Sequence, residues 1–305
     1  MKKPFRGSRD TDVKLSMLHD YLQHFAVALQ DQGFARLYID AFAGTGSKTE
    51  TRPALPLFGP EFAEPHEVNT PGSARLALAV DPPFHTLVFI ERDQERFREL
   101  EQLKKEFPDQ KIYLKHGDAN ASVKSLCSHV PWHKRQGDVL GMRGVIFLDP
   151  FGMEVEWSTV EAVAATQALD CWYFFPLSGL YRNAPHDPAK LEASKEEKLD
   201  RLLGTPNWRE RWYQHSIAPK DMFETETEAV RRADVDAIEA YVSERLASLF
   251  KGGVMSPVRL RHNNNAPMAS LFFAVSNPGT KAVALAKRIA GHILKPGSSS
   301  QVRSR

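Results

Sequence analysis

The sequence predicts an α/β fold, with a doubly wound, Rossmann-like sheet that is mostly parallel and has an antiparallel C-terminal strand. Short apolar runs recur along the chain, and each ends in a glycine or a polar turn. Stretches with apolar residues at helical spacing lie between these runs. The 305 residues, 42% of them hydrophobic, suffice for the core of one domain, which we expect to cover residues 1–305.

The first element that we expect is a helix over residues 13–33. Its apolar face repeats at steps of three and four residues from Leu15 to Leu29, and Gly33 is a suitable helix end. Lys14 lies on this helix near the expected cofactor edge of the sheet. A solvated lysine is the simpler expectation for it, and contact with cofactor or substrate is the alternative.

Five strands follow, separated by helical stretches. They are predicted in LYIDAFAG (37–44), HTLVFIERD (85–93), KIYLKHGDAN (111–120), GVIFLDPFG (144–152) and DCWYFFPLSG (170–179). Runs without polar alternation are typical of parallel strands that are buried on both faces. Strands that alternate with helices predict a sheet whose ligands bind at the carboxyl ends of the strands.

The character of the chain changes after Tyr181. Residues 182–250 are highly charged and are expected to form a helical insert. Trp208 and Trp212 alternate with arginines there, which predicts either aromatic packing of the insert or a surface that stacks unpaired bases. The runs SPVRLRHNNN (256–265) and MASLFFAVSN (268–277) predict an antiparallel pair, followed by a helix over 279–294 and a flexible tail over 296–305.

The two cysteines bear on whether the chain binds a metal or forms a disulfide, and the hydropathy of the chain bears on its cellular location. Cys127 and Cys171 lie far apart and lack any metal-ligand spacing, so we expect neither a disulfide nor a metal site. No signal sequence or membrane-spanning stretch is evident, so we expect no membrane partner and a cytoplasmic location.

The charge is distributed unevenly. After Glu244 the chain has ten Lys and Arg and no acidic residue, whereas the part up to and including Glu244 has thirty Lys and Arg against thirty-eight Asp and Glu. A basic end on an acidic body favours a polyanionic partner such as nucleic acid. A solvated face with a disordered tail explains the same pattern.

Four successive strands each end near a carboxylate. Asp40 precedes a glycine turn, and Glu91, Asp118 and Asp149 follow the next three strands. Glycines let backbone N–H groups approach a ligand, and Glu91 can accept both ribose hydroxyls of an adenosine cofactor. The alternative is that each acid only caps the following helix. The predicted cofactor-binding residues are Asp40, Ala41, Phe42, Ala43, Gly44, Gly46, Glu91, Arg92, Asp118 and Ala119.

The cofactor is then either a dinucleotide or S-adenosylmethionine. A complete GxGxxG is missing, Phe42 precedes Ala43 and Gly44, and an acid comes directly before the turn, all of which favours S-adenosylmethionine. The order of these motifs resembles class I S-adenosylmethionine-dependent methyltransferases. More narrowly, YIDAFAGTG, GSARLAL, FIERD, GDAN, FLDPFG and FFAVSN resemble the three-Cys-motif partner protein family, TcmP, over about residues 13–295. That resemblance implies a partner protein with three cysteines, itself similar to radical S-adenosylmethionine proteins.

Two tetrapeptides compete for the catalytic position. DPPF at Asp81 follows the first crossover helix and is expected to form a turn on the face opposite the cofactor. DPFG follows the fourth strand, where methyltransferases of exocyclic amines carry such a motif, so Asp149, Pro150, Phe151 and Gly152 are the predicted catalytic residues. The Asp149 carboxylate and the Pro150 carbonyl can accept the two amine hydrogens while Phe151 stacks on the base.

The sequence therefore predicts an S-adenosylmethionine-dependent N-methyltransferase that acts on an exocyclic amine of a base in RNA or DNA. Two alternatives stay open at this point. The enzyme could modify a small molecule, nucleoside or peptide, or the chain could be a non-catalytic subunit of the three-cysteine partner. The segment between Gly46 and Gly72 contains several prolines and separates the first strand from the next helix. A long insertion of this kind is typical of a lid or a binding loop.

Overall fold

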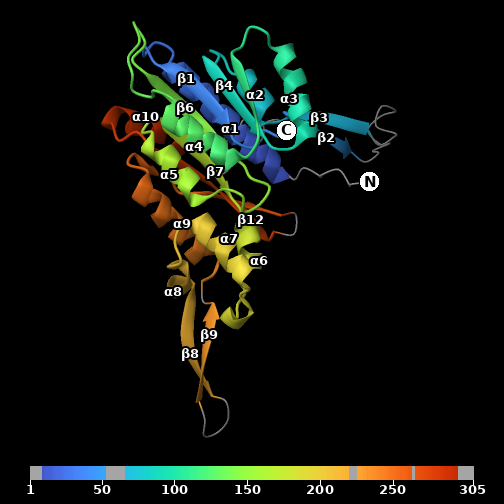
Figure 1. Ribbon diagram of the computed structural model, residues 1–305, viewed down its shortest axis with the longest axis vertical. Coiled ribbons are helices and arrows are strands. Elements are labelled where there is room, and N and C mark those ends of the chain that lie inside the picture. Colours follow the sequence, from blue (N-terminus) through green and yellow to red (C-terminus); the bar gives the residue numbers. More distant parts are fainter. Residues whose placement is uncertain (1–8, 53–65, 220–224, 232, 263–264, 295–305) are drawn as a thin grey trace.

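One central sheet organises the molecule (Figure 1). The computed structural model describes residues 9–52, 66–219, 225–231, 233–262 and 265–294. The sheet runs in the order β10-β12-β7-β6-β1-β4-β5, and β11 also pairs with β12. Its strands are β1 (Ala35–Asp40), β4 (Thr86–Glu91), β5 (Ile112–His116), β6 (Met142–Leu148), β7 (Leu169–Phe175), β10 (Gly253–Val254), β11 (Val258–Arg261) and β12 (Pro267–Val275).

The strand directions confirm the predicted fold class. Strands β5, β4, β1, β6 and β7 are parallel, whereas β12 runs antiparallel to β7. The parallel order reverses direction at β1, with β4 on one side and β6 on the other. Ligands of open α/β sheets bind at such a reversal, beside the carboxyl ends of the strands.

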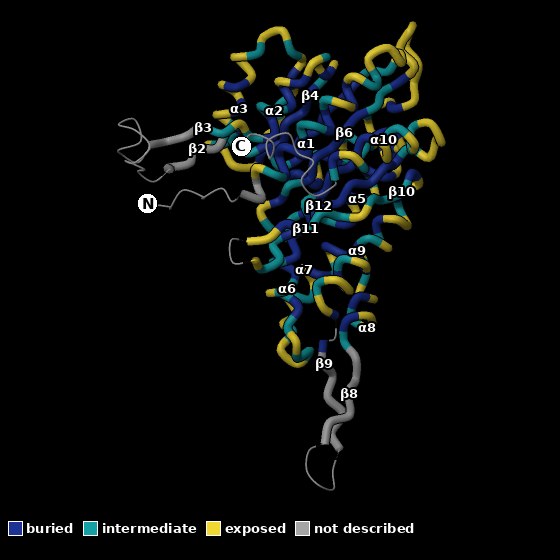
Figure 2. Tube along the Cα trace, turned by 180° about the vertical axis from the view of Figure 1, so that it is seen from behind, coloured by how far each residue is buried: buried dark blue, intermediate teal, exposed yellow. Residues whose placement is uncertain are grey.

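Both faces of the sheet are buried, because successive side chains of a strand point to opposite faces. In β6, Ile146 and Leu148 belong to one apolar core, and Val145 and Phe147 belong to the other. The buried residues in Figure 2 follow the sheet, and the exposed ones lie on outer helices and loops. The uninterrupted apolar runs of the sequence therefore correspond to strands covered on both sides.

Two groups of helices cover these faces. The first packs on the core that contains Phe147 and consists of α1 (Arg9–Ala28), α2 (Ser73–Leu78), α3 (Gln94–Glu106) and α10 (Thr280–Ile293). The second packs on the core that contains Ile146 and consists of α4 (Ala119–His129), α5 (Trp157–Ala165), α6 (Leu177–Asn183), α7 (Ala193–Leu203), α8 (Trp208–Trp212) and α9 (Val235–Leu249). Among the described residues, no helix is long and apolar enough to cross a bilayer, and no group of three or more His, Cys, Asp or Glu could hold a metal.

The insert contains more than the expected helices. Besides α6 to α9 and the short 3-10 helix η3 (Pro188–Lys190), it includes the antiparallel strands β8 (Tyr213–Pro219) and β9 (Thr225–Arg231). This strand pair was not expected from the sequence. The charged composition concealed the period-two pattern of β9, in which threonine alternates with glutamate over residues 225–228.

Trp208 and Trp212 belong to the core and not to a surface. Their exposed fractions are 0% and 1%, and the two rings lie 5.1 Å apart. Trp208 Nε1 donates to Asp200 Oδ1 over 2.7 Å. The prediction that these rings pack the insert is confirmed, and the alternative of a base-stacking surface is wrong.

DPPF lies at the amino end of β4, on the edge away from the carboxyl ends of the strands. Phe84 is buried there between Phe25 and Tyr38, with ring centroids 6.2 and 5.9 Å away. The prediction that this motif is a structural turn is confirmed.

Two other predictions fall partly or wholly outside the described residues. The segment after Gly46 begins and ends as the antiparallel strands β2 (Ser47–Arg52) and β3 (His66–Pro71), and residues 53–65 between them lie outside. The tail over 296–305 also lies outside.

Candidate cofactor and active site

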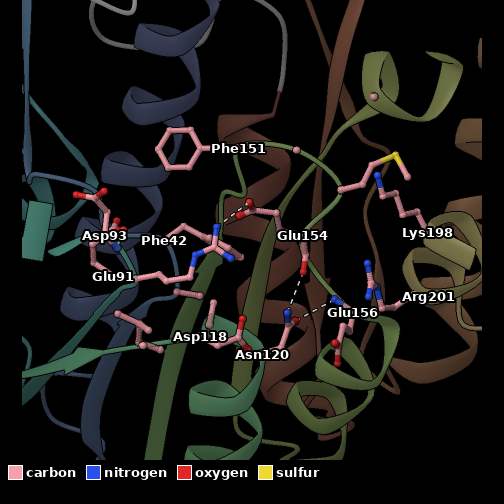
Figure 3. Close-up of a pocket in the computed structure, with 18 of the residues that line it drawn as sticks. Phe42, Glu91, Asp93, Asp118, Asn120, Phe151, Glu154, Glu156, Lys198 and Arg201 are labelled. Atoms are coloured by element: carbon pink, nitrogen blue, oxygen red, sulfur yellow. Dashed lines mark hydrogen bonds and ion pairs between the residues drawn. The ribbon is translucent and has the colours of Figure 1, made fainter. Parts of the chain in front are cut away.

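A cavity of about 910 Å³ lies at the carboxyl ends of β1, β4, β5 and β6 (Figure 3). Its volume is in the range of small-molecule and cofactor pockets. The sequence-predicted residues that line it are Ala41, Phe42, Glu91, Arg92, Asp118, Ala119, Phe151 and Gly152. The structure therefore brings residues from four separate strand ends to one cavity.

The other predicted residues do not line this cavity. They are Asp40, Ala43, Gly44, Gly46, Asp149 and Pro150. Asp40 is fully buried, and Asp149 is joined to helix α1. The contacts of Asp40, Gly44 and Asp149 show how these three residues support the site.

Glu91 ties the glycine turn to the end of β4. Its buried carboxylate accepts a hydrogen bond from Gly44 N at 3.0 Å and another from Asp93 N at 2.7 Å. A carboxylate has about four acceptor positions, so two remain for ligand hydroxyls. Gly44 has a φ of +62°, a conformation that favours glycine, although a Cβ there would meet no atom within 4 Å.

Asp118 combines the two roles that the sequence left open. Its carboxylate caps α4 by accepting from Ala121 N at 2.9 Å, and the residue also lines the cavity. The capping interpretation is confirmed for this residue. It does not exclude ligand contact, because only one of the two carboxylate oxygens accepts that hydrogen bond.

Asn120 is a positioning residue that the sequence analysis missed, although it belongs to the quoted GDAN motif. Its side chain donates to Glu154 O at 2.9 Å and accepts from Glu156 N at 2.9 Å (Figure 3). It also accepts from the Thr159 hydroxyl at 2.7 Å. It therefore fixes the segment that follows DPFG against the start of α4. Arg92 holds the same segment less firmly than Asn120 does, because its ion pair with Glu154 spans 3.4 Å and its side chain is 70% exposed.

Asp40 is fully buried at the end of β1, directly before the cavity-lining Ala41. Its carboxylate accepts from Phe42 N at 3.2 Å and from the Tyr38 hydroxyl at 3.4 Å. Burial raises the pKa of Asp40 to about 7, and the charge of Asp149 adds to the rise, while hydrogen bonds from Ser73, Phe42 and Tyr38 oppose it. Its placement makes it a support for the turn that begins at Ala41.

The raised pKa of Asp40 predicts a pH-dependent stability. The folded state holds the proton more tightly than the unfolded chain, whose ordinary pKa is 3.8, so this contribution is complete below about pH 4 and is lost as the pH rises through 7. The free energy of unfolding of the native protein, relative to that of Asp40→Asn, should fall by up to about 1.4 kcal/mol per pH unit over this window. Urea denaturation of both proteins at several pH values measures the difference, and parallel pH curves would contradict the assignment.

Lys14 is buried and pairs with the predicted catalytic acid. Its Nζ lies 2.6 Å from Asp149 Oδ2, and the residue is only 6% exposed. The same ammonium lies 4.3 Å from the centroid of the Phe174 ring. The expectation of a solvated lysine is wrong. The signal was in the sequence, because Lys14 precedes Leu18 and Tyr21 by four and seven residues and so lies on the buried face of α1.

Phe151 is the exposed part of DPFG. It is 65% exposed, lines the cavity and has the Arg96 guanidinium 4.4 Å from its ring centroid. A large apolar side chain that is exposed in the lining of a cavity can stack on a planar ligand.

Sequence comparisons give no family for the chain. It matches no protein-family model and no curated protein sequence. Among solved structures, LPL1258 from Legionella pneumophila, described with the family model DUF519, has a TM-score of 0.51 at 15% identity over 97% of this chain and 96% of that one. An S-adenosylmethionine-dependent methyltransferase from Clostridium acetobutylicum has a TM-score of 0.33 at 11% identity over 84% and 91%. The N-terminal domain of EvdMO1, solved with SAH bound, has a TM-score of 0.37 at 12% identity over 84% and 79%. The Legionella structure supports the predicted fold over nearly the whole of both chains.

Proposed function

We propose that the chain is an S-adenosylmethionine-dependent N-methyltransferase that acts on an exocyclic amine of a nucleic-acid base. The observation that carries the proposal is the Lys14–Asp149 ion pair, which fixes the DPFG carboxylate directly after β6, at the edge of the sheet that holds the cavity. The TcmP family and its three-cysteine partner protein stay predictions from the sequence resemblance.

The residues around the cavity fit an adenosine cofactor. The Glu91 carboxylate keeps acceptor positions for two ribose hydroxyls, and Asp118 and Ala119 form the neighbouring wall at the start of α4. When bound, S-adenosylmethionine supplies an electrophilic methyl group. The chain's own contribution is to hold the cofactor at the ends of β1, β4 and β5 and the acceptor beside the end of β6.

Asp149 and Pro150 supply acceptors for an amine. Lys14 occupies Asp149 Oδ2, and among the described residues nothing donates a hydrogen bond to Oδ1 or to the Pro150 carbonyl. Neither residue lines the cavity itself, but both directly precede Phe151 and Gly152, which do. We expect an amine at this end of the cavity to donate its two hydrogens to these oxygens, which would orient its nitrogen, whose lone pair is otherwise delocalised into the ring. Positioning of this kind can account for much of the rate in a transfer reaction.

The test of the proposal is transfer of labelled methyl groups to nucleic acid. The purified protein is incubated with tritiated-methyl S-adenosylmethionine and with total RNA or total DNA. We expect label in one of the two nucleic acids, incorporated about 100-fold more slowly by Asp149→Asn. Bound cofactor without label in either nucleic acid would reject the nucleic-acid substrate.

Phe151→Ala should weaken substrate binding more than it slows the chemistry. Stacking of one base on an aromatic ring contributes about 1–3 kcal/mol, so KM for the nucleic acid should rise roughly 5- to 150-fold with kcat little changed. Tyr113→Ala is the matched control, because Tyr113 is 50% exposed and does not line the cavity. Steady-state kinetics separate the two parameters, and an unchanged KM would remove the stacking role.

The basic C-terminal region does not carry this proposal. Arg259 pairs with Asp236 at 2.7 Å and with Glu239 at 2.9 Å, and no described residue beyond Arg201 lines the cavity. Support for an anionic substrate has to come from cations at the cavity itself.

A further inference from the structure

The insert contributes three cations to the wall of the cavity. Arg182 comes from α6, and Lys198 and Arg201 come from α7. Lys198 and Arg201 are three residues apart and therefore lie on one face of their helix. Figure 3 shows these two side chains beyond Glu156, on the side of the cavity away from Glu91 and Asp118. All three residues are exposed.

These cations differ from the other described cations of the insert. Four of those other cations form ion pairs with carboxylates, namely Lys190–Asp187, Lys195–Glu192, Arg209–Asp200 and Arg211–Glu244. Arg231 and Arg245 donate to backbone carbonyls. Within the part of the chain that the structure describes, Arg182, Lys198 and Arg201 have neither an ion pair nor a hydrogen bond.

The acidic residues on the same wall have other partners. Glu156 accepts from Lys124 Nζ at 2.8 Å, and Glu154 pairs with Arg92 at 3.4 Å. The Lys124 hydrogen bond is the main cause that lowers the pKa of Glu156, and the charge of Arg201 adds a smaller part. The three insert cations therefore leave positive charge that this wall does not neutralise.

We propose that Arg182, Lys198 and Arg201 form a subsite for a phosphate ester of the substrate. Phosphate oxygens can accept two parallel hydrogen bonds from an arginine guanidinium and can form an ion pair with a lysine ammonium. Such contacts position a nucleic acid without reading its sequence. The subsite rests on the proposed function, because it places a phosphate in the cavity where Phe151 is available to the base. The phosphate belongs either to the backbone of a strand or to a free nucleotide.

The test compares two triple variants with equal loss of charge. Arg182→Ala/Lys198→Ala/Arg201→Ala removes the subsite, and Lys190→Ala/Lys195→Ala/Arg211→Ala removes three paired cations of the same insert that do not line the cavity. Binding of fluorescein-labelled single-stranded RNA and DNA is followed by anisotropy at several salt concentrations. Loss of three phosphate contacts should lower the slope of log affinity against log salt by about 2 and weaken binding roughly 10- to 100-fold at 0.1 M salt. The control variant should bind as the native protein does.

Calorimetric titration with AMP and GMP distinguishes the two sources of the phosphate. Mononucleotide binding that is lost in the subsite variant, without binding of either strand, assigns the phosphate to a free nucleotide. The proposal is overturned if the native protein binds neither strands nor mononucleotides, or if both triple variants lose binding equally. It is also overturned if the subsite variant loses affinity for S-adenosylmethionine to the same extent, because the cations would then belong to the cofactor site. Cation-dependent binding without methyl transfer would reject the proposed function and keep the subsite.

Discussion

Asp149→Asn is expected to lower kcat for methyl transfer about 100-fold, with little change in the affinity for S-adenosylmethionine. Asparagine keeps the volume of the side chain but loses the charge that Lys14 binds at 2.6 Å, so the acceptor oxygen is no longer held in one orientation. A displacement of about 1 Å at a reacting group can cost a factor of this size. Single-turnover kinetics with labelled cofactor measure the chemical step.

Asp138→Asn is the control for this experiment. Asp138 is exposed, lies on the loop before β6 and does not line the cavity. A native rate in Asp149→Asn would show that DPFG is only a turn and would end its assignment as the catalytic motif.

Lys14→Met is expected to destabilise the protein and to slow methyl transfer together. Removal of the ammonium leaves the Asp149 carboxylate, whose side chain is 22% exposed, without its partner. Loss of a partner from a mostly buried charge costs about 1–3 kcal/mol here, less than for a fully buried pair because water reaches Asp149. Denaturant unfolding measures the loss.

A double-mutant cycle separates the pair from simple packing. In Lys14→Met/Asp149→Asn no charge is left without a partner, so the double variant should be more stable than the sum of the single losses predicts. Strictly additive losses would show that the two side chains do not interact in solution. The rate of the double variant should stay low, since the carboxylate is absent.

The spacing of apolar residues along the chain predicted the strands and turns that pack in the hydrophobic core. The uninterrupted apolar run that ends at Asp149 predicted a strand covered on both faces, and β6 is such a strand. The position of DPPF after a crossover helix predicted a structural turn, and Phe84 is packed accordingly. Such predictions succeed because the spacing of apolar residues and the glycines and prolines that end an element can be read directly from the sequence.

The features that the sequence analysis missed depend on tertiary pairing. Lys195 has a carboxylate partner in Glu192, whereas Lys198, one turn later on the same helix, has no partner among the described residues and faces the cavity. Sequence alone cannot decide which of two similar lysines finds a carboxylate. Asn120 was missed for the same reason, because its three hydrogen bonds reach residues more than thirty positions away along the chain.

The central claim is that the cavity binds S-adenosylmethionine through Glu91, and calorimetric titration of the purified protein with S-adenosylmethionine and S-adenosylhomocysteine tests it most directly. Glu91→Ala removes the acceptor that holds Gly44, and Glu95→Ala, at an exposed residue nearby on α3, is the matched control. We predict one site with a Kd of roughly 1–100 µM in the native protein and in Glu95→Ala, and at least about tenfold weaker binding in Glu91→Ala. An absence of binding to the folded native protein, or equal affinity in Glu91→Ala, would contradict the account.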